Sequence, residues 1–109
     1  MISVQNDSNF LNICEIGKEL GISILAISQK GMSDHFAGMS QSENPIAFKS
    51  HNKCHTLHDS LAWYETSIKE IIEAGDHHLI LCHVHNLDRN QNALPLLYYS
   101  GYKTLGEDL

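Results

Sequence analysis

Histidine and cysteine side chains are the groups of this sequence most capable of chemistry. The chain has eight histidines and three cysteines, and most of them fall in two clusters. The clusters are His51, Cys54, His55 and His58, and then His77, His78, Cys82, His83 and His85. Imidazole and thiolate groups are common ligands of zinc, so a metal site is the first hypothesis to test.

The spacing of these residues argues against zinc. The sequence has no Cys-x-x-Cys pair and no helical His-x-x-x-His pair with a neighbouring glutamate. Alternation along a strand would place His77 and His83 on one face and Cys82 on the other, so the second cluster cannot converge on one ion. We therefore expect no metal, and histidines that are solvated or hydrogen-bonded.

Motifs for nucleophilic catalysis and for phosphate binding are also missing. Ser33 precedes an Asp-His pair, but neighbours in sequence do not form a triad, and no Gly-x-Ser-x-Gly segment occurs. Neither a Gly-x-Gly-x-x-Gly segment nor a Walker loop is present. Cys14 and Cys82 lie in apolar segments, where a thiol is expected to be inert.

Length and charge narrow the class of protein. The 109 residues suit one domain over 1–109 with a modest core. With 7 Lys and Arg against 13 Asp and Glu, the net charge is −6, so nucleic acid and anionic membrane surfaces are not expected partners. Three cysteines cannot build a disulfide framework, and no signal peptide or membrane span is visible, so we expect a cytoplasmic protein. A small ligand or another protein is the expected partner.

The first half of the chain gives four expected elements. Asp7 and Ser8 offer an N-cap for a helix over residues 9–20, which would end before Gly21. Residues 22–27 read as a strand buried on both faces. Residues 29–39 suggest a short, interrupted helix, and residues 40–56 read as a polar loop.

The second half is less uniform. Residues 57–74 fit both helical and alternating spacing, so the pattern alone does not decide between helix and strand. After the Gly75-Asp76 turn, residues 78–85 read as a central strand, and residues 86–92 as a turn-rich loop. A last strand is expected over 95–99, with Pro95 at its first position.

Five segments, read in order, carry a resemblance to a known family. They are Ser8–Leu25, Phe36–Gly38, Leu61–Trp63, Gly75–His77 and Pro95–Tyr102. The chain resembles the flavin reductase-like family, the FMN-binding split β-barrels, almost from end to end. The resemblance implies a mainly β fold with flanking helices, of the α+β class, in which Ala62–Glu73 is a strand.

The resemblance also implies a function and a site. Such reductases reduce FMN, and less often FAD, with NADH or NADPH, are generally homodimers, and often supply a partner monooxygenase. The match assigns His77 to the site where flavin and nicotinamide meet, as the residue for catalysis. It places Ser8 near the flavin phosphate or the adenosine side, and Ser33, Phe36 and Ala37 along the phosphate and ring.

The sequence departs from the family pattern at several places. Family members usually carry about two further strands before the segment that corresponds to residue 1, so we expect an N-terminally truncated barrel that is completed by a second copy or an exchanged strand. Phe10 stands where the family commonly has a threonine, and His35 where a basic residue is frequent. The Gly-Pro pair expected near residues 54–56 is missing. The alternative hypothesis is therefore a non-catalytic flavin-binding or interaction module.

Overall fold

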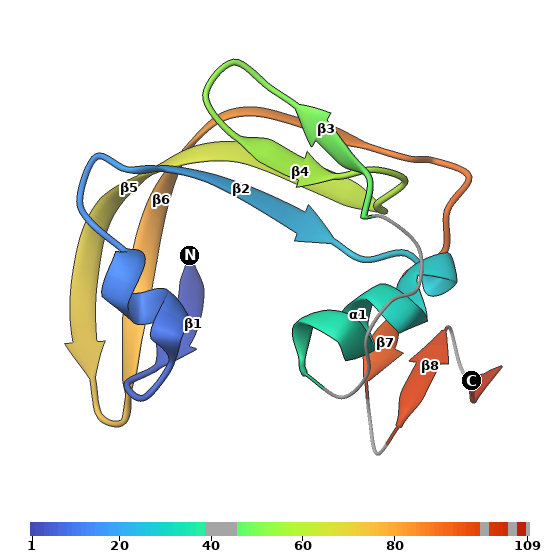
Figure 1. Cartoon of the computed structure of the whole chain (residues 1–109), viewed down its shortest axis with the longest axis horizontal. Helices are drawn as coiled ribbons and strands as arrows, with labels where there is room; N and C mark the ends of the chain where they lie inside the picture. Colours follow the sequence, from blue (N-terminus) through green and yellow to red (C-terminus); the bar gives the residue numbers. More distant parts are fainter. Residues whose placement is uncertain (39–45, 99–100, 105–106, 109) are drawn as a thin grey trace.

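Four antiparallel strands form the main sheet of the protein. We describe a computed structural model, which covers residues 1–38, 46–98, 101–104 and 107–108. The strands β1 (Ile2–Gln5), β2 (Glu19–Ile24), β5 (Ala62–Ala74) and β6 (His77–Arg89) lie in the order β1-β6-β5-β2. Figure 1 shows that the long strands β5 and β6 bend over the rest of the chain, so the sheet is a curled half-barrel.

The β5–β6 hairpin is the backbone of this sheet. Gly75 adopts a left-handed φ of 63° at the turn, a conformation that glycine reaches without strain, and Ala74 pairs directly with His77. Irregular pairing at Glu65/Thr66 and Ile68/Glu70 bends the hairpin. Ile68 and Ile80 are 2% and 0% exposed, so the two long strands carry the core.

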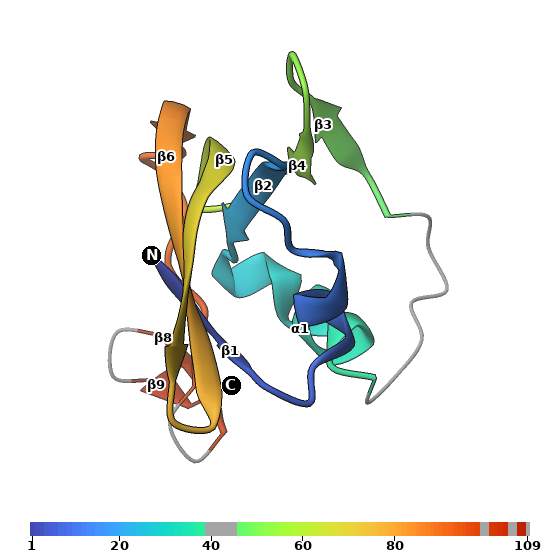
Figure 2. The same ribbon diagram turned by 90° about the vertical axis from the view of Figure 1, so that its left-hand side faces the viewer.

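Smaller elements flank the sheet. The hairpin of β3 (Phe48–Ser50) and β4 (His55–Leu57) lies beside β2, and Figure 2 shows it on the far side of β2 from β5 and β6. The 3-10 helices η1 (Asn9–Ile13) and η2 (Ile27–Gln29) and the α-helix α1 (Lys30–Phe36) connect the strands. A small sheet near the C-terminus contains β7 (Leu97–Tyr98), β8 (Tyr102–Thr104) and β9 (Glu107–Asp108).

The expected helix over 9–20 is wrong. Ser8 does cap a helix, but the helix is the five-residue η1, and Cys14 is already extended with ψ of 123°. Gly17 then turns the chain with φ of 91°, and β2 begins at Glu19, which pairs with Ser67. Pairing with β5 prevails over the helical spacing of the apolar residues, and Gly21 lies inside a strand instead of past a helix end.

Three other expectations need correction. Residues 40–56 were expected to be loop, but they include β3 and the start of β4. The expected loop over 86–92 begins late, because β6 continues to Arg89 opposite Ala62. Pro95 does not begin a strand of five residues: it forms an isolated bridge with Ala26, and β7 follows at 97–98. Residues 39–45 and 99, which the expected elements included, lie outside the described residues.

The fold class is as expected. The protein is mainly β, with α1 as the α-helix of the described residues, and β5 spans the segment that the family resemblance made a strand. Strand β1, by contrast, was not foreseen, since residues 2–5 are too short a run to stand out. In the part of the chain that the structure describes, no helix has the length and apolar character needed to cross a membrane.

Candidate functional site

The end of β1 meets the turn of the long hairpin. Gln5 pairs with His77 in the sheet, and Asn6 continues the contact, since its N–H donates to the Asp76 carbonyl at 3.0 Å. The Asn6 side-chain amide donates to the Gly75 carbonyl at 3.3 Å. Two segments about 70 residues apart in sequence are thereby joined around His77.

Ser8 lies one turn beyond this junction. Its N–H donates to the Gln5 carbonyl at 3.0 Å, and its hydroxyl oxygen accepts from the N–H of Phe10 at 3.3 Å. The hydroxyl is thus the N-cap of η1, as expected. Because the oxygen acts as the acceptor in this bond, its hydrogen can still donate to an anion.

His77 has a defined partner. Its Nδ1 lies 2.8 Å from Oδ1 of Asp76, and the side chain is 34% exposed. The hydrogen bond from His77, together with its charge, holds the pKa of Asp76 below its usual value, so the carboxylate accepts and Nδ1 carries the proton. In the neutral ring this leaves Nε2 as an acceptor, and in the protonated ring Nε2 becomes a donor.

His78 faces the other way and is tied to β1. Its Nδ1 donates to Oδ1 of Asn6 at 2.6 Å, and its Nε2 lies 3.9 Å from a carboxylate oxygen of Glu73. Asn6 therefore binds both the turn backbone and His78. Nothing in the sequence pattern marked Asn6, because its partners are far away along the chain.

Helix α1 carries the other three expected site residues. Ser33 lies in the helix, Ala37 is its C-cap with its N–H donating to the Ser33 carbonyl at 3.0 Å, and Phe36 is 58% exposed. Phe36 is therefore not a core residue. It lines a pocket of about 380 Å³ between α1, η1, β2 and the β3–β4 hairpin.

We call this cavity the Phe pocket. Its lining residues are Phe10, Gly21, Ser23, Phe36, Phe48, His55, Thr56 and Leu57. Phe10, which appeared in the sequence only as a departure from the family pattern, thus lines the same cavity as Phe36. The rings of Phe48 and His55 meet edge to face, with centroids 6.4 Å apart.

The expected residues form an extended surface and not one compact cluster. Ser8 connects its two parts, because it is joined to Gln5 opposite His77 and caps the helix that carries Phe10. His77 is not among the described residues that line the Phe pocket. Beside His77, a separate pocket of about 310 Å³ is lined by Gln5, Asn6, Asp7 and Asp76.

Several of the remaining histidines and cysteines make structural contacts. Within the described ranges, no three His, Cys, Asp or Glu side chains are grouped so that they could hold a metal ion. The rings of His83 and His85 lie side by side, with centroids 4.7 Å apart. Nε2 of His85 lies 2.8 Å from the Ser67 hydroxyl. Burial raises the pKa of the Cys14 and Cys54 thiols, which keeps them protonated at neutral pH.

A comparison with models of protein families covers almost the whole chain. The model of the flavin reductase like domain matches residues 1–106. The chain belongs to the flavin reductase-like family. The expectation drawn from the five sequence segments is confirmed.

Individual relatives agree with the family assignment. The NADH-dependent flavin reductase StyB of Pseudomonas fluorescens is 32% identical over 69 residues, which are 62% of this chain and 41% of StyB. Among solved structures, the flavin reductase PheA2 matches with a TM-score of 0.87 and 25% identity, over 97% of this chain and 69% of that one. The styrene monooxygenase flavin reductase SMOB of Pseudomonas putida S12 matches with a TM-score of 0.82 and 26% identity, over 99% and 70%.

These matches fix the fold of this flavin reductase-like chain. Its curled half-barrel corresponds to the split barrel of the flavin reductases, as expected. The matching segment covers less than half of StyB and about 70% of the two structural relatives.

Proposed function

We propose that the protein binds FMN, in preference to FAD, reduces it with NADH or NADPH, and supplies the reduced flavin to a partner oxygenase. The observation that carries this proposal is the junction of β1 with the Gly75 turn, which sets His77 beside the loop of Ser8, next to the Phe pocket. Two relatives support the proposal: StyB is an NADH-dependent flavin reductase, and SMOB is the flavin reductase of a styrene monooxygenase.

The Phe pocket suits a planar, largely apolar ring. Phe10, Phe36 and Phe48 give aromatic walls, and the volume of about 380 Å³ lies in the range of small-molecule sites. Ser8 would donate its hydroxyl hydrogen to the flavin phosphate, and Ser33 and Ala37 on α1 would lie along the cofactor. The residues of the pocket therefore fit the flavin ring well. The phosphate would be held by neutral hydrogen-bond donors.

The chemistry belongs to the cofactors, and the chain's residues align them. A bound flavin would supply the acceptor for a hydride, two electrons with one proton, from the nicotinamide of NADH or NADPH. His77 would meet the nicotinamide side through Nε2, because Asp76 holds the proton on Nδ1. A fixed imidazole there reduces the number of orientations that the dinucleotide can adopt.

Steady-state turnover tests the proposal. Purified protein should oxidise NADH or NADPH faster when FMN is added, measured as the loss of absorbance at 340 nm. Heat-denatured protein serves as the control for reaction between the free cofactors. An oxidation rate that does not change with FMN at any protein concentration would reject the catalytic proposal.

The second candidate is a non-catalytic module that binds flavin weakly. The charge of the site favours it. Neither Lys nor Arg is among the described residues that line the Phe pocket or the pocket beside His77. The pocket beside His77 is instead lined by the acidic residues Asp7 and Asp76. Phosphate binding normally draws on cationic side chains. Colourless, inactive protein that still quenches flavin fluorescence would support this candidate over the first.

A further inference from the structure

A separate pocket lies at the opposite end of the long hairpin. Its volume is about 270 Å³, and it lies between the β3–β4 hairpin, the start of β5 and the end of β6. Since β5 and β6 are 13 residues each, this end is roughly 40 Å along the strand from the Gly75 turn at about 3.3 Å per residue. We call it the Trp63 pocket, after the side chain at its base.

Trp63 forms a fixed aromatic wall. The ring of His51 lies against it with centroids 4.1 Å apart and planes tilted by 38°, and the ammonium group of Lys49 lies 5.1 Å from the Trp63 ring centroid. His51 is held in turn by the buried hydroxyl of Thr56, 2.7 Å from its Nε2. Alternation along β3 places Lys49 on this side, and Phe48 in the Phe pocket on the other side.

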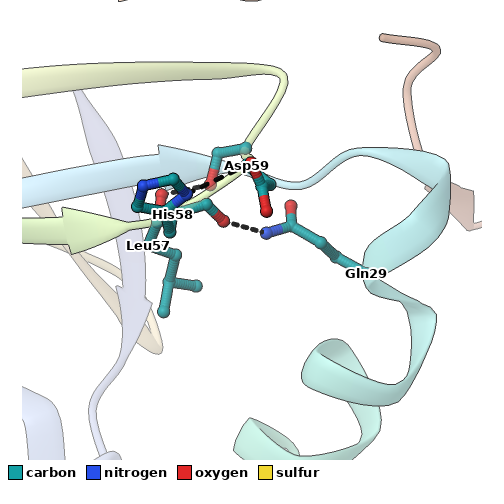
Figure 3. A network of polar contacts seen from close by, with 5 residues as sticks. Gln29, Leu57, His58 and Asp59 are labelled. Carbon is teal, nitrogen blue, oxygen red and sulfur yellow. Dashed lines mark hydrogen bonds and ion pairs between the residues drawn. The ribbon is translucent and has the colours of Figure 1, made fainter. Parts of the chain in front are cut away.

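The rim of the pocket is a rigid loop. Gln29, which is 6% exposed, donates to the His58 carbonyl at 2.8 Å (Figure 3). Its side-chain oxygen accepts from the Ala26 N–H at 2.9 Å. The Ser60 hydroxyl donates to the Leu57 carbonyl at 3.0 Å. These bonds hold Asp59 at φ of 63°, a left-handed conformation that is uncommon outside glycine. A preformed rim lowers the entropy that a ligand must lose on binding.

The charges of the pocket leave its cations available to a ligand. Asp59 accepts from Nδ1 of His58 at 3.1 Å, and Asp88 accepts from the N–H of Arg89 at 2.8 Å. None of the ion pairs found among the described residues includes the side chain of Lys49 or Arg89. Both side chains line the pocket, as do the carboxylates of Asp59 and Asp88. Each carboxylate already accepts a hydrogen bond from its neighbour, so an anion would bind between Lys49 and Arg89.

We propose that the Trp63 pocket binds an aromatic carboxylate. The ring of the ligand would lie against Trp63 and Leu57, and its carboxylate would lie between Lys49 and Arg89. A pocket of about 270 Å³ holds a ligand of one or two rings and is small for a nucleotide. Leu57 lines both this pocket and the Phe pocket, but the proposed partners of the carboxylate, Lys49 and Arg89, line only the Trp63 pocket, so the proposal does not depend on the flavin chemistry.

Fluorescence provides a direct test, because Trp63 is the single tryptophan of the sequence. Benzoate is titrated into the full chain, with excitation at the red edge of tryptophan absorption. Three ligands serve as controls. Cyclohexanecarboxylate keeps the charge but has a saturated ring, benzamide keeps the aromatic ring but has no charge, and AMP is a nucleotide. Benzoate should quench Trp63 saturably, and the other three should bind at least about tenfold more weakly.

Variants locate the binding. Lys49→Met and Arg89→Gln should each raise the Kd for benzoate about tenfold, since each removes one charged partner of the carboxylate. Lys53→Met is the matched control, because Lys53 is on the same hairpin but faces Glu19 at 3.9 Å, and its Kd should stay unchanged. Circular dichroism checks that the variants are folded.

Four results would overturn the proposal: no saturable quenching by benzoate, equal binding of cyclohexanecarboxylate or benzamide, tighter binding of AMP, or a Lys53→Met effect as large as that of Lys49→Met.

Discussion

His77 is set apart from the other histidines by its position at the junction of β1 with the Gly75 turn, where its Nδ1 also contacts Asp76. The contact with Asp76 at 2.8 Å fixes which ring nitrogen carries the proton, so His77 can orient a ligand with a defined acceptor or donor. The family resemblance pointed to this residue, but the role of Asp76 became visible only with the side chains in place.

Replacing His77 tests its place in the reaction. We expect His77→Ala to slow hydride transfer about tenfold, the equivalent of one hydrogen bond, and to change the Kd for FMN much less. Single-turnover reduction of FMN by NADH under nitrogen gives the rate, and quenching of flavin fluorescence gives the Kd. His78→Ala is the matched control, since His78 is held by Asn6 away from the pair. Equal losses in rate and affinity, or none in either, would remove His77 from the role.

The same pair predicts a pH dependence. The pKa of Asp76 lies below its ordinary value of 3.8 when the protein is folded, because His77 donates to the carboxylate. A lowered folded pKa means that the contact stabilises the folded state above pH 3.8, and that this contribution is lost as acid protonates the carboxylate. In His77→Ala the pKa of Asp76 should rise toward the ordinary value, as measured by NMR titration of its carboxyl carbon. A titration that is the same in both proteins would contradict the contact.

Among the elements, β2 shows where tertiary contacts prevail over local pattern. Apolar residues between Phe10 and Leu20 recur at near-helical spacing, yet only η1 is helical, because the chain from Glu19 onward pairs with β5. The β3–β4 hairpin was missed for a related reason. Its strands have three residues each, with one large apolar residue apiece, so no periodicity could reveal them before their packing against β2 was known.

Gly21 in β2 is required by this packing. A Cβ atom at Gly21 would lie 2.0 Å from the backbone oxygen of His55, and backbone cannot move aside cheaply. We expect Gly21→Ala to lower the free energy of unfolding by roughly 1 to 3 kcal/mol, measured by urea denaturation.

Gly31 in α1 is the matched control for Gly21, because an added Cβ there meets nothing within 4 Å. Gly31→Ala should raise the free energy of unfolding by about 0.5 to 1 kcal/mol, as expected for alanine in a helix. If both variants changed stability in the same direction, the close approach of β2 to β4 would be refuted.

At the scale of the molecule, one face of the main sheet is apolar and open. Ile2, Ile22, Ile24, Tyr64, Cys82 and Val84 are among the residues that line it. Ile24 and Val84 are 43% and 42% exposed, and within the described residues β1 pairs with β6 and with no second strand. Such a face and a free edge favour association, so we propose a homodimer or strand-exchanged oligomer.

A charge on this face should weaken the association. We expect Val84→Glu to shift the protein to a smaller species in analytical ultracentrifugation, because a carboxylate on an apolar interface is not solvated. His83→Glu serves as the control, since His83 is the neighbouring exposed residue on the other face of β6. An unchanged mass for Val84→Glu, or the same shift for both variants, would place the interface elsewhere.

The sequence anticipated the architecture better than the site. The Gly75 turn and the strand after it could be predicted from local turn chemistry and apolar runs, and the family from five segments in order. That residues 62–73 form the other strand of the hairpin followed only from the family resemblance, because their spacing fits helix and strand alike. The Phe pocket and the Asn6 contacts could not, because each joins residues that are distant in the chain, such as Phe10, Phe36 and Phe48. No pattern in a single sequence reports such contacts.

The central claim is that a flavin lies along the surface from the Phe pocket past Ser8 to His77. The most direct test is a titration of isotope-labelled protein with FMN, followed by amide shifts in two-dimensional NMR spectra. The account predicts saturable shifts at Ser8, Phe10, Phe36 and His77, and none at Arg89 or Asn90. Shifts that are absent from these four amides, or that appear only at the Trp63 pocket, would contradict it.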